Sequence, residues 1–275
     1  MISCLILTLN EEQNLPRCLD SLRWCDDILV FDSFSTDRTV EIARAAGAQV
    51  MQRKFDNERD QRLASLKLPF KYPWVYNPDA DEVTPADLRD EMLRVVQDGN
   101  RSETAYRVRF KTIFMGRWIK HSSLYPTWVV RLFRPETITF ERTINLHYQI
   151  AGKEGRLNSH FEHFTFNKGF DAWFEKHNRY SWHEAEENLK WLAHGDFHFS
   201  DLGSSEATVR RRALKELSFR LPCRSLLRFL YMYGLRLGFL DGLPGYHYCR
   251  MLAIYEYMIV LKMQEIERRK MGMPI

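Results

Sequence analysis

The first fifty residues alternate between continuous apolar runs and amphipathic segments. Residues 2–9 (ISCLILTL) form a run in which six of the eight residues are apolar, as expected for a strand that is buried on both faces. A helix with Leu15 and Leu19 on one face follows, and then come a second strand at 27–31, a second helix and a third strand at 48–51. This β-α-β-α-β order predicts an α/β fold with a parallel, doubly wound sheet.

Two aspartates one residue apart follow a short apolar run at 74–76. They are Asp79 and Asp81, and Pro85 then opens an acidic segment with helical character. Ligands of open α/β sheets collect at the carboxyl ends of strands, and hard divalent cations prefer carboxylate oxygens. The two aspartates could therefore hold a metal against a diphosphate. The alternative is a turn that only caps the next helix.

Polar residues also follow the first two predicted strands, at 10–14 and 32–37. Asn, Asp, Ser and Thr cap helix N-termini, and they can also bind a ribose or a base. The chain has no G-x-G-x-x-G after its first strand and no G-x-x-x-x-G-K-S/T. These absences exclude the dinucleotide-binding fingerprint and the P-loop, so another nucleotide-binding fold is required.

Four motifs resemble, in order and spacing, those of family 2 glycosyltransferases. They are TLNEE at 8–12, FDSFSTDRT at 31–39, Gln61-Arg62, and DADE at 79–82. Members of that family have the GT-A fold, a Rossmann-like mixed sheet with helices on both faces. They are inverting enzymes that use nucleotide-diphosphate sugars and a divalent metal. The resemblance therefore implies an enzyme that uses Mn²⁺ or Mg²⁺ and, as we expect, a uridine nucleotide.

The same resemblance assigns roles to residues of the donor site. It implies that Asp79 contacts the sugar nucleotide and that Asp81 binds the metal. The other implied donor contacts are Thr8, Asn10, Glu12 and Asp32 in the nucleoside pocket, with Gln61 and Arg62 near the base and ribose. One departure is Leu63, where the family often has Asn, and it puts a base or ribose contact in doubt.

The second half of the predicted catalytic domain, residues 101–167, is expected to form the acceptor side, with residues 1–100 as the donor side. A metal bound by Asp81 and a diphosphate still has open positions, so a histidine is a chemically reasonable further ligand. We expect this ligand to be His163, which ends the sequence HFEH at 160–163. The alternative is a purely structural histidine.

The catalytic base is less clearly marked. Inversion requires a base within hydrogen-bond reach of the acceptor hydroxyl. Relatives often carry N-E-H where this chain has Asn145-Leu146-His147, so Leu146 replaces the expected glutamate. Glu141, His147 or Glu162 could serve instead, and a weakened or non-catalytic protein is the remaining alternative.

Residues 168–275 are predicted to form a separate helical region. Its first helix resembles a segment of membrane-associated family 2 enzymes that borders the active site. By that resemblance four consecutive residues could bind phosphate of the donor or of a lipid-linked acceptor: Lys176, His177, Asn178 and Arg179. A solvated helix face is the alternative.

The tail has a basic and apolar character. Net charge is only +4, but residues 208–236 carry eight basic residues against a single acid, Glu216. Four arginines spaced by four, four and eight form one stripe of a helix beside many leucines: Arg220, Arg224, Arg228 and Arg236. This pattern predicts a helix at a membrane surface with arginines on anionic headgroups. The alternatives are a helical hairpin packed on the catalytic domain and a homodimer contact.

The composition limits the other possibilities. The five cysteines are odd in number and lack C-x-x-C spacing, which argues against a disulfide framework or structural zinc. The apolar run at 2–9 lacks a basic leader, so we expect no signal peptide. No run reaches the roughly 18 apolar residues of a membrane-spanning helix. We therefore expect a peripheral protein on the cytoplasmic face of the inner membrane.

Taken together, these patterns favour a metal-dependent, inverting glycosyltransferase that acts on a lipid-linked glycan in cell-envelope polysaccharide or lipopolysaccharide synthesis. The segments RFLYMY at 228–233 and GFLDG at 238–242 resemble the C-terminal region of bacterial enzymes that extend lipopolysaccharide core or lipid-linked exopolysaccharide. One alternative is a synthase that loads a sugar onto polyprenyl phosphate, whose phosphate acceptor needs little help from a base. Another is a non-catalytic nucleotide-sugar-binding membrane scaffold. The aliphatic setting of the basic tail argues against nucleic acid.

Overall fold

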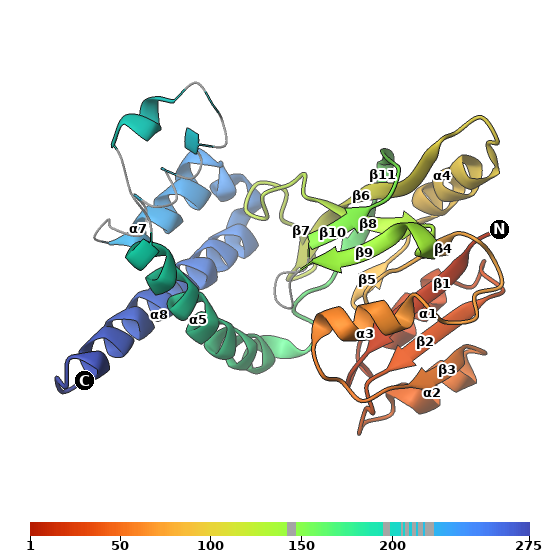
Figure 1. Ribbon diagram of the computed structural model, residues 1–275, viewed down its shortest axis with the longest axis horizontal. Helices are drawn as coiled ribbons and strands as arrows, with labels where there is room; N and C mark the ends of the chain where they lie inside the picture. The colour runs from red at the N-terminus through yellow and green to blue at the C-terminus, as the bar shows by residue number, and fades with distance from the viewer. Residues whose placement is uncertain are drawn as a thin grey trace. The chain divides into compact units, whose positions relative to one another are not determined.

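The computed structural model describes residues 1–141, 147–194, 199–204, 206, 209–210, 213, 217 and 223–275 (Figure 1). The chain divides into two compact units. The N-terminal unit contains Met1–Trp118 and Leu124–Lys168, and the C-terminal unit contains Ile119–Ser123 and Gly169–Ile275. Each unit has its own packing, so we treat them separately.

A nine-stranded sheet forms the centre of the N-terminal unit. Its strands run in the order β3-β2-β1-β4-β8-β6-β11-β5, and β7 pairs with β6. Their bounds are β1 (Ser3–Thr8), β2 (Ile28–Asp32), β3 (Gln49–Gln52), β4 (Val75–Tyr76), β5 (Glu82–Val83), β6 (Glu103–Phe114), β7 (Arg117–Trp118), β8 (Trp128–Phe133) and β11 (Lys153–His163). The predicted α/β fold is confirmed, and the first three strands lie within one residue of their predicted positions.

The direction of the strands determines where a site can form. Strand β1 is parallel to β2 and β4, and β6 is parallel to β11. Strand β8 is antiparallel to both β4 and β6, so these two strands also share one direction. The carboxyl ends of β1, β2, β4, β6 and β11 therefore lie along one edge of the sheet, which we call the carboxyl edge.

Helices cover both faces of this sheet, because alternate residues of a buried strand point to opposite sides. The helices are α1 (Leu15–Ser21), α2 (Thr39–Ala45), α3 (Glu58–Ser65) and α4 (Ala86–Gln97). Apolar residues of α1, α2 and α4 join one core cluster, with Ile6 and Tyr76 from the strands. The other face packs on α3 and on a hairpin of β9 (Ile138–Glu141) and β10 (His147–Ile150), which follows the short helix η1 (Pro135–Thr137).

The C-terminal unit is helical. It contains α5 (Gly169–His194), η2 (Phe199–Gly203), α7 (Arg224–Phe229), the π-helical turn η3 (Leu230–Leu235), η4 (Gly238–Asp241) and α8 (Gly242–Lys270). Inside it the Lys262 ammonium, on α8, donates to the Asn178 Oδ1 (2.6 Å) and the Ser181 Oγ (2.7 Å) of α5. Among the residues that the structure describes, no helix has the length and apolar character needed to cross a bilayer.

Candidate active site

The carboxyl ends of β1 and β2 are joined through a buried aspartate. The Thr8 hydroxyl donates to Asp32 Oδ1 (2.9 Å), and the Ser35 backbone N–H and the Gln52 side-chain amide each donate to Asp32 Oδ2 at 2.9 Å. Burial alone would raise the pKa of Asp32, but these hydrogen bonds outweigh it and lower the pKa. Thr8 and Asp32 are buried, so their first effect is to fix the two loops at this edge.

The loops after these strands brace one another. The Asn10 backbone N–H donates to the Ser35 hydroxyl (2.8 Å), and Asn10 Oδ1 accepts from the Thr36 backbone N–H (2.8 Å). Glu12 Oε2 accepts from the Arg38 backbone N–H at 3.1 Å. Asn10 has a φ of 55°, a left-handed conformation that asparagine tolerates better than most residues. The result is a polar, partly exposed rim above β1 and β2.

Helix α3 directs two polar side chains to this rim. Asn57 caps the helix by accepting from the Asp60 backbone N–H (2.9 Å), which fixes its first turn. The buried Gln61 amide donates to the Ser33 hydroxyl at 3.1 Å. Arg62 donates to Asn77 Oδ1 (3.2 Å), directly after β4. The structure therefore brings together the predicted donor residues of the first, second and third motifs.

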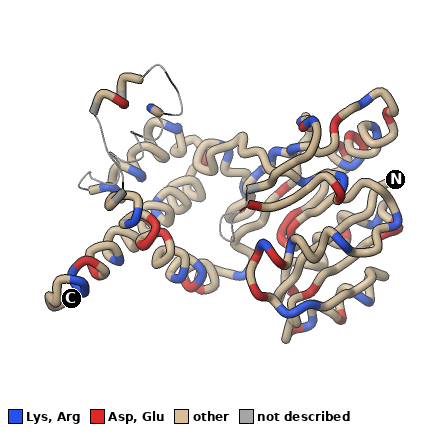
Figure 2. The backbone as a smooth tube through the Cα atoms, in the orientation of Figure 1, with Lys and Arg blue, Asp and Glu red and all other residues tan. Residues whose placement is uncertain are grey.

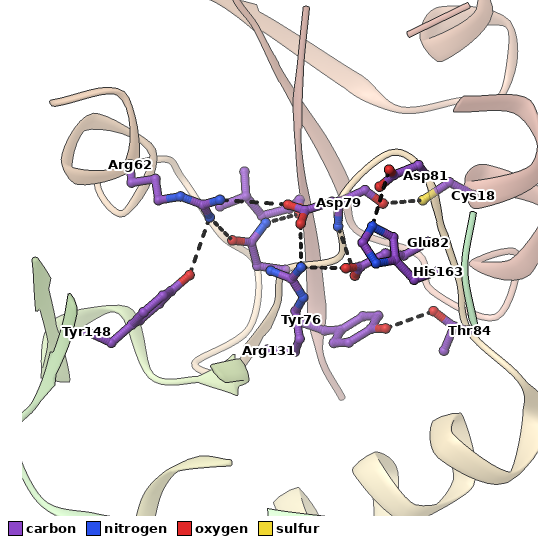
Figure 3. A network of polar contacts seen from close by, with 12 residues as sticks. Cys18, Arg62, Tyr76, Asp79, Asp81, Glu82, Thr84, Arg131, Tyr148 and His163 are labelled. Atoms are coloured by element: carbon purple, nitrogen blue, oxygen red, sulfur yellow. Dashed lines mark hydrogen bonds and ion pairs between the residues drawn. The ribbon is translucent and has the colours of Figure 1, made fainter. Parts of the chain in front are cut away.

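Asp79 lies between two guanidinium groups, as Figure 3 shows. Arg131 of β8 donates to Asp79 Oδ2 and to Glu82 Oε1, the latter at 2.5 Å, and Arg62 NH2 lies 3.7 Å from Asp79 Oδ1. Burial opposes the ionisation of Asp79, but the charges of Arg131 and Arg62 outweigh it and hold its pKa at about 2. Asp79 is therefore ionised throughout the physiological pH range.

Asp81 pairs with His163, which lies near the end of the chain segment 124–168 of the N-terminal unit. Strand β5 pairs with β11, which places His163 opposite Glu82. His163 Nε2 then lies 3.3 Å from Asp81 Oδ2 (Figure 3). Burial favours the neutral ring, but the contact with Asp81 raises the pKa of His163. Both side chains stay accessible, at 27% exposed for Asp81 and 21% for His163.

This pair is suited to a shared divalent cation. A carboxylate oxygen and an imidazole nitrogen both bind Mn²⁺, and their separation allows both to reach one ion after small side-chain rotations. No group of three or more His, Cys, Asp or Glu side chains in the described part of the chain could hold a metal alone. The donor set therefore fits an ion whose other ligands are supplied by a bound substrate, such as phosphate oxygens.

Arg131 is the site residue whose role the sequence did not reveal. The run RLFR at 131–134 is visible in the sequence, but no local spacing connects it to Asp79. The antiparallel pairing of β8 with β4 makes that connection, because it places Leu132 opposite Tyr76 and brings Arg131 beside the loop after β4. Burying an unpaired arginine in a strand costs free energy. An arginine inside a strand with apolar neighbours therefore indicates that an acidic partner lies nearby, and this was the feature of the sequence that could have pointed to Arg131.

The three candidate bases lie in different surroundings. Glu162 is half-buried, and its Cα pairs with Lys111 of β6 and Val83 of β5 at the carboxyl edge. Glu141 is exposed on the β9–β10 hairpin and accepts from the Gln149 amide. His147 begins β10, but its side chain, like all of Leu146, lies outside the described residues. Of these candidates, Glu162 is adjacent in sequence to His163.

The predicted phosphate and membrane residues lie in the C-terminal unit. His177 meets Tyr255 of α8 edge to face with ring centroids 4.9 Å apart, and Asn178 accepts from the Lys262 ammonium, so both help to join α5 to α8. Lys176 and Arg179 are exposed. Arg224 forms an ion pair with Glu256 of α8 (2.8 Å) and is only 16% exposed, whereas Arg228 and Arg236 are half-buried. Arg220 lies outside the described residues.

Comparisons with known proteins identify the family of the chain. The family model described as Glycosyl transferase family 2 matches residues 3–165. An uncharacterized glycosyltransferase of Rickettsia typhi is 24% identical over 270 residues, which cover 96% of this chain and 87% of the relative. The lipopolysaccharide core biosynthesis glycosyltransferase LpsC of Rhizobium meliloti is 26% identical over 200 residues, 69% of this chain and 72% of LpsC. The crystal structure of S. aureus TarS 1-349 superposes with a TM-score of 0.45 and 14% identity, covering 98% of this chain and 91% of TarS 1-349.

Proposed function

Since this chain belongs to glycosyl transferase family 2 and is a glycosyltransferase, we propose that it transfers one sugar, with inversion, from a nucleotide-diphosphate sugar to a lipid-linked glycan. The observation that carries the proposal is the arrangement at the carboxyl edge. There Asp81 and His163 form an accessible pair beside Asp79, which is held by two guanidinium groups. A uridine diphosphate sugar is the donor that we propose.

The donor diphosphate would lie against Asp81 and His163. A divalent cation bound there would neutralise the negative charge that develops on the leaving diphosphate. Arg62 and Arg131 keep Asp79 ionised and fixed, so its carboxylate is oriented before the donor binds. The nucleoside would occupy the rim above β1 and β2, where Asn10 and Glu12 remain accessible. In this assignment the protein positions the donor and stabilises the charge of its leaving diphosphate.

We propose Glu162 as the base that accepts the proton of the acceptor hydroxyl. Glu162 lies at the carboxyl edge and directly precedes His163. Because successive residues of a strand point to opposite faces, the Glu162 side chain projects from the face of β11 opposite to that of His163. Glu141, in contrast, already accepts a hydrogen bond from Gln149 on an exposed hairpin. Single displacement requires a base across the anomeric carbon from the leaving group, and Glu162 is the candidate whose strand register places it beside His163 at the carboxyl edge.

Replacing the proposed base gives a direct prediction. Glu162→Gln keeps the size of the side chain but cannot take a proton, so we expect kcat to fall by about 10²- to 10⁴-fold. The measurement is the rate of nucleotide release from the donor with a bacterial lipid extract as acceptor. Glu141→Gln is the matched control and should keep activity within about twofold, because surface substitutions away from a site have small effects. The reverse pattern would assign the base to Glu141 and refute our choice.

Membrane association is supported by apolar residues more than by the arginine stripe. Large apolar side chains are exposed along α7, η3, η4 and the start of α8, with Leu235 at 81% and Leu243 at 64%. We call these residues the apolar surface: Leu226, Leu227, Leu230, Tyr231, Leu235, Leu237, Phe239, Leu240, Leu243 and Tyr246. The basic residues of the same stretch can be followed in Figure 2, and its single acid, Asp241, is buried. We therefore propose peripheral binding to the cytoplasmic face of the inner membrane, by apolar insertion with basic residues near anionic headgroups.

Two substitutions in the apolar surface test this proposal. Burying one leucine side chain stabilises by about 1.5–3 kcal/mol, so the double variant Leu235→Glu, Leu243→Glu should bind vesicles more than about a hundredfold more weakly. The assay is co-sedimentation of the full chain with phosphatidylglycerol-containing vesicles. Leu261→Glu is the matched control, because Leu261 is an exposed leucine near the other end of α8. Equal binding of all three proteins would reject the apolar surface as the membrane contact.

The acceptor is the remaining element of the proposal. Similarity to LpsC supports a lipopolysaccharide core or related lipid-linked glycan. The departure at Leu146 would also suit a synthase that glycosylates polyprenyl phosphate. Analysis of the product separates the two, since a glycosidic bond survives mild acid and a sugar phosphodiester does not. An acid-stable lipid glycan is the expected product, and an acid-labile polyprenyl product would select the synthase.

A further inference from the structure

Cations and aromatic rings gather on one side of the acceptor half of the N-terminal unit. Arg109 lies 5.7 Å from the ring centre of Trp128 and 5.8 Å from that of Tyr125. The Arg156 guanidinium lies 5.2 Å from the centre of the Trp128 ring, on which it also packs. Lys111 stands 4.7 Å from the centre of the Trp118 ring. We call this set, together with His160, the cation-aromatic cluster.

The rings of the cluster also contact one another. Trp118 meets Tyr125 edge to face at 5.2 Å, and its ring lies nearly parallel to that of His160 with centroids 6.5 Å apart. The members come from β6, β7, β8, β11 and the loop before β8. Residues that are distant in sequence therefore form one continuous surface. Because aromatic faces attract cations, the rings hold the cationic groups in place before any ligand binds.

The positive charge of this surface is not compensated by ion pairs. Among the described residues, no carboxylate forms an ion pair with Arg109, Lys111 or Arg156, whereas Arg107 on the same strand is paired with Glu154 (2.5 Å). Burial and then the charge of Lys111 lower the pKa of His160, Asp87 opposes them, and Arg109 adds a smaller lowering effect. Glu162 is the one acid in register with the cluster, opposite Lys111. Three cations against two nearby acids, Glu162 and Asp87, leave a net positive surface that is suited to an anion.

The cluster borders the proposed site of transfer. Lys111 pairs with Glu162, and Thr112 pairs with His163, so the last residues of β6 and β11 lie side by side at the carboxyl edge. Side chains alternate along β6, so Arg109 and Lys111 share one face of the sheet. Glu162, opposite Lys111, lies on that same face, one residue from the partner of Asp81. A group held by the cluster would reach the candidate base.

We propose that the cation-aromatic cluster is a subsite for an acceptor saccharide that carries a carboxylate or a phosphate. Arg109, Lys111 and Arg156 bind the anionic group, and the aromatic rings provide a flat surface for the sugar. The identification of this ligand as the acceptor rests on the proposed function. Single-stranded nucleic acid also uses cations and rings, but the cluster lies beside a glycosyltransferase base, which favours a sugar.

Fluorine NMR of the fluorotryptophan-labelled full chain tests the subsite. Signals of Trp118 and Trp128, assigned with Trp118→Phe and Trp128→Phe, report on the cluster directly. The probes are glucuronate, glucose phosphorylated on its primary hydroxyl, glucose, inorganic phosphate and a short oligothymidylate. We expect the two anionic sugars to shift both signals at lower concentration than glucose or inorganic phosphate. The stronger of the two identifies the anion of the acceptor.

Charge-removing variants separate this result from general charge effects. Lys111→Gln and Arg156→Gln should each weaken binding of the anionic sugars by about tenfold. Arg107→Gln, which removes an already paired cation from the same strand, should leave it unchanged. Equal affinity for glucose or inorganic phosphate would overturn the proposal, and tighter binding of oligothymidylate would replace it with a nucleic-acid surface. Calorimetric titration with uridine diphosphate on the same samples keeps the two claims apart, since donor binding tests the proposed function alone.

Discussion

Replacing Asp81 by Ala is expected to lower the rate of sugar transfer by about 10³-fold or more. The structure places the Asp81 carboxylate 3.3 Å from His163 Nε2, with both side chains accessible at the carboxyl edge. In the reaction that we propose, the charge that develops on the leaving diphosphate is the largest electrostatic change. Removing one group that stabilises such a charge typically costs about 10²- to 10³-fold, and a lost metal adds to this.

The rate of nucleotide release measures this effect, and folding must be checked in parallel. Asp81 makes no ion pair with a lysine or arginine in the described part of the chain, so we expect the variant to unfold near the wild-type temperature. Asp90→Ala is the matched control, because Asp90 is an exposed aspartate of α4 that forms an ion pair with its neighbour Arg89 and with no other residue that the structure describes. Wild-type turnover in Asp81→Ala would contradict the proposed donor site.

The second large effect concerns stability and is expected for Arg131→Met. Arg131 is buried and forms ion pairs with two carboxylates, those of Asp79 and Glu82. Its removal leaves the buried Glu82 without its guanidinium partner, while Asp79 keeps its contact with Arg62. Breaking a buried ion pair by deleting one partner destabilises by about 3–5 kcal/mol. For a domain of this size we expect the Tm to fall by roughly 10 °C.

Differential scanning calorimetry of two further variants isolates the cause. Arg134→Met removes the other arginine of the same run, which packs on Trp74 at 5.0 Å from the ring centre, and should cost only about 0.5–1 kcal/mol. In a Glu82→Gln background, Arg131→Met should destabilise less, because no unpaired buried carboxylate is then left at position 82. An equal loss in both backgrounds would show that packing, not charge, accounts for the effect.

The donor side of the site could be predicted from the sequence because its signals are local. Asp79 and Asp81 directly follow a strand, and the polar loops at 10–14 and 32–37 follow two others. In a sheet whose first strands are parallel, such positions must meet at one edge. The structure brings these segments together, although the ligand contacts of each residue remain predictions.

Other parts of the site depend on pairings that local patterns do not encode. Arg131 reaches Asp79 only because β8 inserts antiparallel between β4 and β6, and this choice is made by the whole sheet. Likewise, Arg109 and Arg156 come from separate strands, and both lie near Trp128. The alternation at 105–110 predicts a strand, but it does not indicate which neighbours the strand will have.

The tail shows a different limit. Helical spacing placed four arginines in one stripe, but it could not show whether another helix covers that stripe. Arg224 pairs with Glu256 of α8, and the helix α7 gives way to the π-helical turn at Leu230. The side chains left outward are leucines and aromatics. The spacing of the arginines in the sequence indicates which face of a helix they share, whereas the tertiary structure determines what that face contacts.

Calorimetric titration with uridine diphosphate and guanosine diphosphate, each with and without Mn²⁺, tests whether the carboxyl edge is a metal-dependent donor site. It should be run on the wild-type chain and on Asp81→Ala. We expect the wild type to bind uridine diphosphate only when Mn²⁺ is present, and Asp81→Ala to lose this binding. Failure of the folded wild type to bind either nucleotide, or binding that is indifferent to both Mn²⁺ and Asp81, would contradict this expectation.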